Sequence, residues 1–287
     1  MTFDALHLGL LLLTGAGAGA LGALVGIGGG VMVIPVLVLG FGIDVRVAIA
    51  ASLVAVIATS SAAGSVYVGE GLTNMRLAMT LEVATTAGAL VGGITAALIP
   101  QQALLMVFSV FLVVTSALLF MGTEEGERRL PAEGEEVAGY EAHGRLAGGF
   151  RSPRTGEMVE YRAQRLPMGL AVSFVAGNVS GLLGVGGGFL KVPAMRVGMR
   201  VPMRVAAATS NFMIGVTAAA SLVIYIQRGF LYPLVAAPIA VGVAAGALAG
   251  THLSALVSGR ALARLLAVLL AAVAVQVALK AAGVAFG

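Results

Sequence analysis

The stretch Gly26-Ile27-Gly28-Gly29-Gly30-Val31-Met32-Val33-Ile34-Pro35 decides the fold, because it returns as Gly184-Val185-Gly186-Gly187-Gly188-Phe189-Leu190-Lys191-Val192-Pro193. The offset, 184 − 26 = 158, holds without a gap well beyond the glycines. At this offset Arg46-Val47-Ala48 meets Arg204-Val205-Ala206, and Gly88 and Gly92 meet Gly246 and Gly250. Compositional bias would align alanines and leucines rather than these rarer residues in one register. The chain therefore contains an internal duplication.

The residues around both copies have the composition of a membrane protein. Of the 287 residues, 59% are hydrophobic and 10% charged, with a mean hydropathy of +1.02, whereas soluble domains carry about 25% charged residues. Stretches such as 8–41 and 231–256 are nearly free of charge, and 123–165 is crowded with it. We expect a multi-pass protein of the cytoplasmic (inner) membrane that contacts lipid, with no cleavable signal. The basic residues mark segment ends, so no nucleic-acid partner is expected.

Each half is predicted to hold five helical elements, two of them short for a bilayer crossing of about 20 residues. The organisation is a first repeat (1–122), a cytoplasmic loop (123–165) and a second repeat (166–287). Each repeat starts with a helix, breaks at its glycines, continues in a short segment and ends in three helices. The expected ranges are 3–23, 29–42, 46–68, 76–99 and 102–121, then 166–182, 187–199, 203–226, 231–256 and 260–281.

The distribution of arginine and lysine predicts that the two repeats have opposite orientations. In the first half, the connections near residues 44 and 101 hold Arg46, while the connection near 75 and the long loop hold eight arginines. In the second half the bias is reversed, so equivalent loops face opposite sides. The fold class is therefore an all-α polytopic membrane protein with an inverted repeat, a re-entrant glycine-broken element in each half, and both termini outside. Four full helices per half, with the glycine segment a kink, would instead make the repeats parallel.

The long loop has two interpretations. A turn signal at 152–156 separates two short runs that contain Leu146, Phe150, Val159 and Tyr161. This pattern is typical of a small β-hairpin. A disordered linker fits the sequence equally well.

The glycine breaks are the candidate central site. A phosphate loop or dinucleotide fingerprint is excluded by context, because no Lys-Ser/Thr pair follows the glycines and no soluble βαβ unit surrounds them. In a membrane, broken helices with free backbone groups occur where they line a cavity. The segments that follow would present N–H donors and a partial positive charge to an anion. The predicted site glycines are Gly28, Gly29, Gly30, Gly186, Gly187 and Gly188.

Polar side chains near the breaks complete the candidate site. Lys191 follows Gly188 by three residues in an apolar segment, where a buried ammonium is usually functional; the alternative is a lysine that snorkels to the cytoplasmic face. Ser52, Thr209, Ser210 and Asn211 lie just downstream of the breaks. These groups either line a solute path or serve as hydrogen-bonding contacts between helices.

Other residues receive structural or gating roles. The prolines Pro35 and Pro193 and the arginines Arg46 and Arg204 recur in register, and the arginines are first of all interface anchors, or else gate charges. Glu82 is the one carboxylate well inside a predicted span; proton coupling is conceivable, but a place near the interface is favoured. The paired glycines Gly88/Gly92 and Gly246/Gly250 predict close helix packing between halves or subunits, so a homodimer is possible. The chain has no cysteine and its three histidines are scattered, so no metal or cofactor is expected.

The paired Gly-x-Gly-Gly-Gly-x4-Pro elements resemble those of the TauE/SafE family of membrane transporters. The resemblance rests on 26–35 followed by Arg46-Val47-Ala48, and on 184–193 followed by Ala208-Thr209-Ser210-Asn211-Phe212, and it covers both halves. It implies export of a small sulfur-containing anion such as sulfite, sulfoacetate or a related sulfonate. One departure is Ala51-Ser52, where the family commonly has Thr-Ser, so a threonine contact is expected from Thr209 alone.

The sequence thus predicts a secondary transporter that exports this anion across the cytoplasmic membrane by alternating access. The alternative is an anion channel or a cation-coupled carrier of another small solute, in which the breaks offer carbonyl oxygens instead of N–H groups. An enzyme is not supported, because no nucleophile, base and orienting group converge in the sequence.

Overall fold

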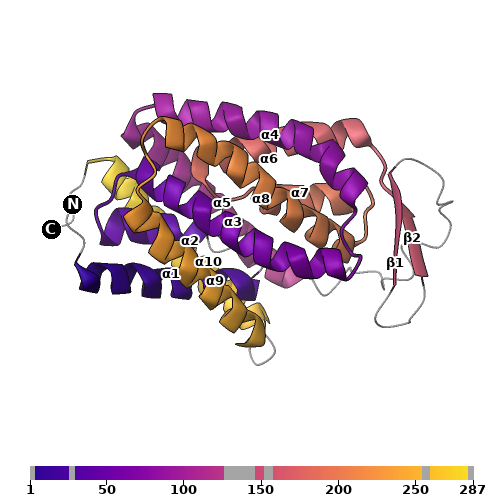
Figure 1. Ribbon diagram of the computed structural model, residues 1–287, viewed down its shortest axis with the longest axis horizontal. Coiled ribbons are helices and arrows are strands. Elements are labelled where there is room, and N and C mark those ends of the chain that lie inside the picture. The colour runs from indigo at the N-terminus through magenta and orange to yellow at the C-terminus, as the bar shows by residue number, and fades with distance from the viewer. Residues whose placement is uncertain (1–3, 26–29, 126–145, 152–157, 254–258, 284–287) are drawn as a thin grey trace.

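A computed structural model describes residues 4–25, 30–125, 146–151, 158–253 and 259–283. In this part of the chain the first half contains α1 (Ala5–Val25), α2 (Gly30–Pro35), the π-helical segment η1 (Val36–Gly40), α3 (Val45–Gly69), α4 (Met75–Leu98) and α5 (Gln101–Glu125). Strands β1 (Ala147–Arg151) and β2 (Met158–Arg162) follow. The second half contains α6 (Leu166–Leu183), α7 (Gly188–Pro193), η2 (Ala194–Gly198), α8 (Met203–Gln227), α9 (Pro233–Leu253) and α10 (Gly259–Ala281). Figure 1 shows these helices as one bundle.

The two halves repeat the same elements in the same order. At the offset of 158 residues, α2 and η1 coincide with α7 and η2 at both ends, and α3 coincides with α8. Each short α-helix changes to the wider π geometry directly after its proline, Pro35 or Pro193, whose nitrogen has no hydrogen to donate to the preceding turn. The predicted elements are confirmed to within a few residues at their ends.

Glycines hold the two halves together. A Cβ on Gly88 or Gly92 of α4 would lie 2.0 Å from a carbonyl oxygen of α6, on Phe174 or Asn178 respectively. A Cβ on Gly246 of α9 would lie 1.9 Å from the carbonyl oxygen of Ala16 in α1. Such backbone approach is the usual way in which membrane helices pack, because a bilayer provides little hydrophobic drive for helix association. The first helix of each half therefore packs on the fourth helix of the other half.

The equivalent helices α3 and α8 run antiparallel to each other. At the start of α3, the Arg46 guanidinium lies 5.5 Å from the ring centroid of Phe230, just beyond the end of α8. At the other end, the backbone N–H of Asn74, which follows α3, donates to Thr209 Oγ1 near the start of α8, at 3.1 Å. Between these two contacts, Ser60 Oγ donates to the Asn211 carbonyl. The beginning of α3 thus lies with the end of α8.

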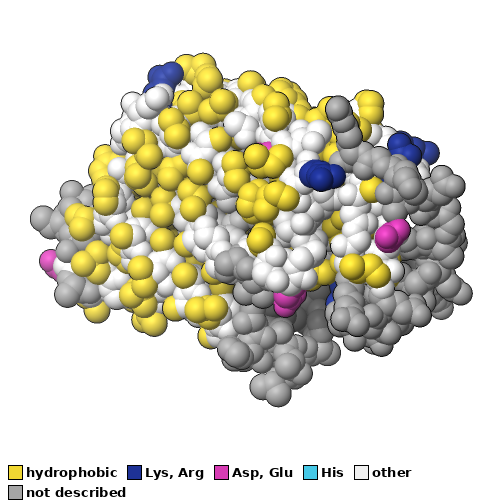
Figure 2. Space-filling model, turned by 45° about the vertical axis from the view of Figure 1, so that its right-hand side comes forward, with side chains coloured by type: hydrophobic (Ala, Val, Ile, Leu, Met, Phe, Trp, Pro, Cys, Tyr) yellow, Lys and Arg dark blue, Asp and Glu magenta, His cyan; other side chains and the backbone are white. Residues whose placement is uncertain are grey.

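The surface of the helical part is apolar. Among the described residues, five helices are long and apolar enough to cross a membrane: α3, α4, the part of α5 up to Phe120, α6 and α8. Large hydrophobic side chains such as Val83, Val110 and Val241 are more than half exposed, which is typical of a lipid-facing surface. Figure 2 shows hydrophobic side chains spread over the visible face with a few charged ones among them. The protein is therefore a multi-pass membrane protein.

A β-hairpin covers one end of the bundle, on the right in Figure 1, while α1 begins and α10 ends at the opposite end. Its two antiparallel strands pair from Ala147 with Arg162 to Arg151 with Met158. Phe150 and Tyr161 are buried against residues of α4, η2 and α8. The Tyr161 hydroxyl accepts a hydrogen bond from Asn74 Nδ2 at 3.0 Å. Of the two interpretations of the loop, the hairpin is the one that the structure has, so the all-α prediction needs this one correction.

Candidate functional site

The two glycine breaks meet at the centre of the bundle. Ser52 Oγ of α3 lies 3.0 Å from the carbonyl oxygen of Gly30 and 2.8 Å from that of Gly184. One hydroxyl proton serves both acceptors, so the serine bridges the start of α2 to the end of α6. A Cβ on Gly30 would lie 3.1 Å from the Gly184 carbonyl oxygen, so the two chain segments touch. The predicted convergence of the breaks is therefore present for the residues that the structure describes.

The second break has a backbone that favours glycine. Gly184, Gly186 and Gly187 have φ angles of 67°, 81° and 72°, in the left-handed region that other residues rarely adopt. Gly184 ends α6 and its N–H donates to the Ser180 carbonyl, while Gly187 precedes α7. A Cβ on Gly186 would meet Ile214 of α8 at 2.8 Å. The break is thus held in a tight space in the bundle interior.

Two buried hydroxyls without a hydrogen-bond partner flank this break. Ser180 Oγ on α6 and Ser210 Oγ on α8 are unpaired in the described structure. A Cβ built on Gly188 would lie 3.5 Å from Ser210 Oγ, and one on Gly187 would lie 3.5 Å from the Ser180 Cβ. A buried polar atom without a partner lowers stability by about 1–3 kcal/mol. Such hydroxyls are therefore available to a bound solute.

Charged side chains meet beside the same break. Lys191 of α7 is 1% exposed, and its Nζ donates to Thr217 Oγ1 of α8 at 3.0 Å. Thr217 Oγ1 lies 2.9 Å from Glu82 Oε1 of α4, and Thr86 Oγ1 lies 3.2 Å from the same carboxylate oxygen. Glu82 is 6% exposed and its Oε2 has no hydrogen-bond partner in the described structure. A threonine hydroxyl thus joins a buried ammonium to a buried carboxylate.

This arrangement decides between the two alternatives for Lys191 and shows the surroundings of Glu82. Lys191 does not snorkel to a surface, since its ammonium is enclosed and bonded to Thr217. The Glu82 carboxylate is 6% exposed and shares Thr217 with Lys191, so it is enclosed by the bundle. A place for Glu82 near the membrane interface stays a prediction, and its enclosed position beside Thr217 also fits a functional carboxylate.

The remaining predicted residues fall into two groups. Thr209 is buried and accepts a hydrogen bond from the backbone N–H of Asn74, and the backbone carbonyl of Asn211 accepts one from Ser60 Oγ. These contacts join α8 to α3 and to the segment that follows α3. Arg46 donates to the carbonyls of Ala96 and Ile99 at the end of α4, at 3.2 and 2.5 Å. Arg204 is half-buried in the first turn of α8. Gly28 and Gly29 lie outside the described residues.

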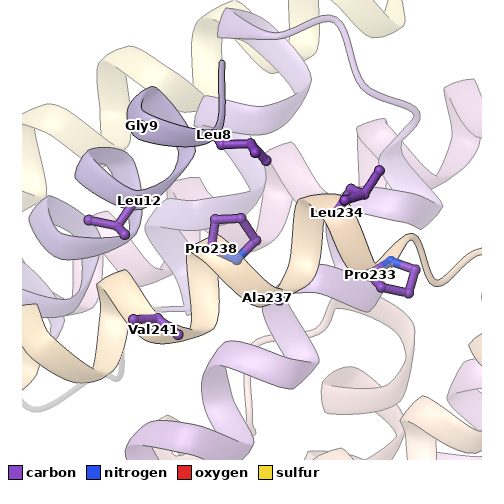
Figure 3. A pocket seen from close by; sticks show the side chains of 8 residues that line it. All are labelled: Leu8, Gly9, Leu12, Pro233, Leu234, Ala237, Pro238 and Val241. Carbon is purple, nitrogen blue, oxygen red and sulfur yellow. The ribbon is translucent and has the colours of Figure 1, made fainter. Parts of the chain in front are cut away.

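A pocket of about 430 Å³ opens elsewhere, on the outer face between α1 and α9. Figure 3 shows Leu8 and Leu12 of α1 and Pro238 and Val241 of α9 among its lining side chains. It offers almost no polar atoms, so it suits an acyl chain of the surrounding lipid rather than an anion. The charged and hydroxyl groups around the second break form a separate region.

Comparison with known proteins then decides the family. The family described as Sulfite exporter TauE/SafE matches residues 11–277, which include both breaks and all of the polar groups above. The chain belongs to the TauE/SafE family. The description of this family is that of an exporter rather than an enzyme.

A curated relative agrees with this family. The chain is similar to the probable membrane transporter protein YunE of Bacillus subtilis (strain 168), with 27% identity over 190 residues. The similarity covers 65% of this chain and 65% of the relative, slightly less than two thirds of that protein's length. No solved structure matches the chain.

Two residues near the second break were not among the predicted site residues. Ser180 lies in an apolar helix with no spacing signal, and nothing in the sequence marks it as a neighbour of Gly187. Glu82 did carry a signal, since a carboxylate within a span is rare and usually functional. Its partner Thr217 is 135 residues away along the chain, so that pairing required the fold.

Proposed function

We propose that this TauE/SafE transporter is a secondary transporter that exports a small sulfur-containing anion, such as sulfite, sulfoacetate or a related organosulfonate, across the cytoplasmic membrane by alternating access. The observation that carries the proposal is the cluster around the second break. There, two buried, unpaired serine hydroxyls lie beside glycines that allow close approach to the backbone. The Lys191 ammonium, on the helix that begins at this break, lies farther along α8, at Thr217. Hydroxyl and N–H donors with one cation are the groups that bind oxyanions.

The arrangement of the halves supports alternating access. The opposite directions of α3 and α8 fit an inverted repeat with an axis in the membrane plane, because parallel repeats would place these equivalent helices in the same direction. The exchange of first and fourth helices between the halves gives two interfaces of the same kind, α1 with α9 and α4 with α6. Rocking of one half on the other would expose the site to each side in turn.

Binding and flux of anions test the proposal. Purified protein is titrated with sulfite, sulfoacetate, methanesulfonate, taurine and sulfate, and uptake is followed in proteoliposomes. Lys191→Gln is expected to weaken anion binding at least about tenfold, because a charge-assisted hydrogen bond contributes roughly 1.5–3 kcal/mol. The double variant Lys191→Gln with Glu82→Gln, which keeps the buried charges balanced, should fold and show the same loss.

Arg228→Gln, at an exposed cation beyond the end of α8, is the matched control and should retain affinity. Unchanged binding in Lys191→Gln would remove the ammonium from the site. Flux that does not saturate with anion concentration and follows the membrane potential would indicate a channel instead. Competition by cations but not by anions would indicate a cation-coupled carrier.

A further inference from the structure

The candidate site holds a cation whose charge is already compensated. The Lys191 ammonium and the Glu82 carboxylate are connected through one atom, Thr217 Oγ1, at 3.0 and 2.9 Å. Both charged side chains are at most 6% exposed. A lysine that is already paired attracts an anion far less than an unpaired one, so the carboxylate competes with any anionic solute for the same ammonium.

We propose that Glu82 takes up one proton when the site binds an anion, so that proton and anion enter and leave together. This inference rests on the proposed function, because it concerns the same site. The receiving atom is Oε2, the carboxylate oxygen that has no hydrogen-bond partner in the described structure. The proton comes from a hydronium ion in the water on the side to which the site is open: one O–H bond of H3O+ breaks and leaves water, one O–H bond forms on Oε2, and no other bond of the protein changes.

Charge balance gives the physical reason. With Glu82 ionised, a bound monovalent anion would leave two negative charges and one positive charge in a nearly water-free interior, where uncompensated charge is strongly disfavoured. With Glu82 protonated, the anion and the ammonium balance each other. The protonated carboxyl also becomes a hydrogen-bond donor, so it can bond to the anion rather than repel it.

No other charged group near Glu82 is placed to take this role in the described structure. The helices that pack most extensively on α4 are α6, which contains no Asp, Glu, Lys, Arg or His, and α8. The hairpin and η2 share a buried cluster with the first turns of α4; on these elements Glu160 and Arg162 are exposed and Arg196 is half-buried. On α8 the titratable groups are Arg204 and Tyr225, which lie 13 and 8 residues from Thr217, or about 20 and 12 Å along the helix. On α4 itself, Arg76 is six residues before Glu82, about 9 Å along the axis. Lys191 of α7 is the charged neighbour that shares a hydrogen-bond partner with Glu82.

The first test is the pH dependence of binding. The probe is methanesulfonate, which carries one negative charge throughout the range from about pH 5 to pH 8. Linkage requires that an anion which brings a proton with it binds more tightly as pH falls, by up to about tenfold per pH unit. Calorimetry in two buffers of different ionisation enthalpy should report close to one proton taken up per anion.

Glu82→Gln copies the shape of the protonated carboxyl and cannot ionise. This variant should bind methanesulfonate about as tightly as the unsubstituted chain does at low pH, with little dependence on pH and no proton uptake. Glu160→Gln, at an exposed carboxylate on β2, is the matched control and should keep the normal pH dependence. In proteoliposomes, coupled movement of one proton and one monovalent anion carries no net charge, so flux should follow a pH gradient and ignore the membrane potential.

The outcomes separate the two proposals. If the unsubstituted chain binds methanesulfonate without proton uptake, or if Glu82→Gln keeps the pH dependence, the coupling proposal is overturned while the transporter proposal stands. If the chain binds none of methanesulfonate, sulfoacetate and sulfite, the proposed function fails, and this inference fails with it. Should Glu82→Gln not fold, the proton count on the unsubstituted chain still decides.

Discussion

The two halves of the chain share a backbone plan but differ in charge at one set of equivalent positions. In the charged copy of these positions, Thr217 joins Lys191 to Glu82. At the offset of 158 residues the counterparts are Thr59, Val33 and Ala240, and Thr59 Oγ1 donates back to carbonyls of its own helix, on Ala55 and Val56. Thr217 Oγ1 also lies 2.8 Å from a carbonyl oxygen of its own helix, on Met213, so the two copies differ in the charged neighbours that only Thr217 has.

This difference separates the features that both halves keep from the charged residues that only one set of positions has. The glycine and proline elements, and the packing of the first helix of each half on the fourth helix of the other, are kept in both halves, because both packing surfaces need them. The charged groups occupy one set of positions, because two buried ion pairs at the centre would add a large desolvation penalty without a second solute to justify it. The site is therefore asymmetric within a nearly symmetric frame.

The comparison is tested most severely by removing one charge and then both. Lys191→Val alone should lower the free energy of unfolding by about 3–5 kcal/mol, because it leaves the Glu82 carboxylate buried without its cation. The double variant Lys191→Val with Glu82→Ala copies the residues found at Val33 and Ala240 and should recover most of that stability. Denaturation in detergent measures both variants, and titration with sulfoacetate should find no binding to the double variant. Equal loss of stability in the single and double variants would mean that the two groups are not energetically paired.

The two threonines give the next contrast. Thr217→Val removes the hydroxyl that serves both charged groups and should lower stability by about 1.5–3 kcal/mol, the range for hydrogen bonds to charged groups. Thr59→Val, at the equivalent position, should change stability by at most about 0.5 kcal/mol. Thermal unfolding in detergent compares them directly. Similar effects at both sites would contradict the asymmetry, since the two substitutions are chemically identical.

Where the halves are alike, equivalent substitutions should have equal effects. Gly88→Ala and Gly246→Ala each place a Cβ about 2 Å from a carbonyl oxygen of the partner helix, so each should lower stability by roughly 1–3 kcal/mol. Gly64→Ala on α3, where a Cβ would meet nothing within 4 Å, is the control and should not lower stability. A large effect at one interface and none at the other would show that the two contacts between the halves differ in strength.

The sequence predicted the parts of the structure that periodicity and duplication control. The helix ranges followed from apolar runs and from the fixed offset of 158 residues, which tied uncertain boundaries in one half to clearer ones in the other. The meeting of Gly30 with Gly184 followed from the rule that broken helices must line a protected interior. These features depend on local sequence or on repetition, both of which can be read directly.

The details of the site could not be predicted in the same way. Whether Lys191 is enclosed depends on α4 and α8 packing over it, and the carboxylate that balances its charge comes from the other half of the chain. Ser180 becomes a site candidate because the turn at Gly184–Gly187 folds back on α6. The hairpin strands could be predicted from their alternation, but the contact of Tyr161 with Asn74 required the tertiary fold.

The smallest expected effect lies at the hairpin end, where the halves differ a second time. Thr209 accepts a hydrogen bond from the backbone N–H of Asn74, whereas its counterpart Ala51 has no hydroxyl. The Asn74 side chain donates to the Tyr161 hydroxyl and also caps α4. Tyr161→Phe should lower stability by about 1 kcal/mol, the usual contribution of one neutral hydrogen bond.

Burial raises the pKa of Tyr161 to about 12 from 10.0, and the hydrogen bond from Asn74 opposes part of that increase. Because the raised pKa belongs to the folded state, the contribution of Tyr161 is complete below about pH 10 and is lost as pH rises toward about 12. Tyrosinate absorbance and thermal unfolding over this interval measure the loss, which should be absent in Tyr161→Phe. An ordinary titration of Tyr161 near pH 10 would mean that the hairpin does not stay docked on Asn74.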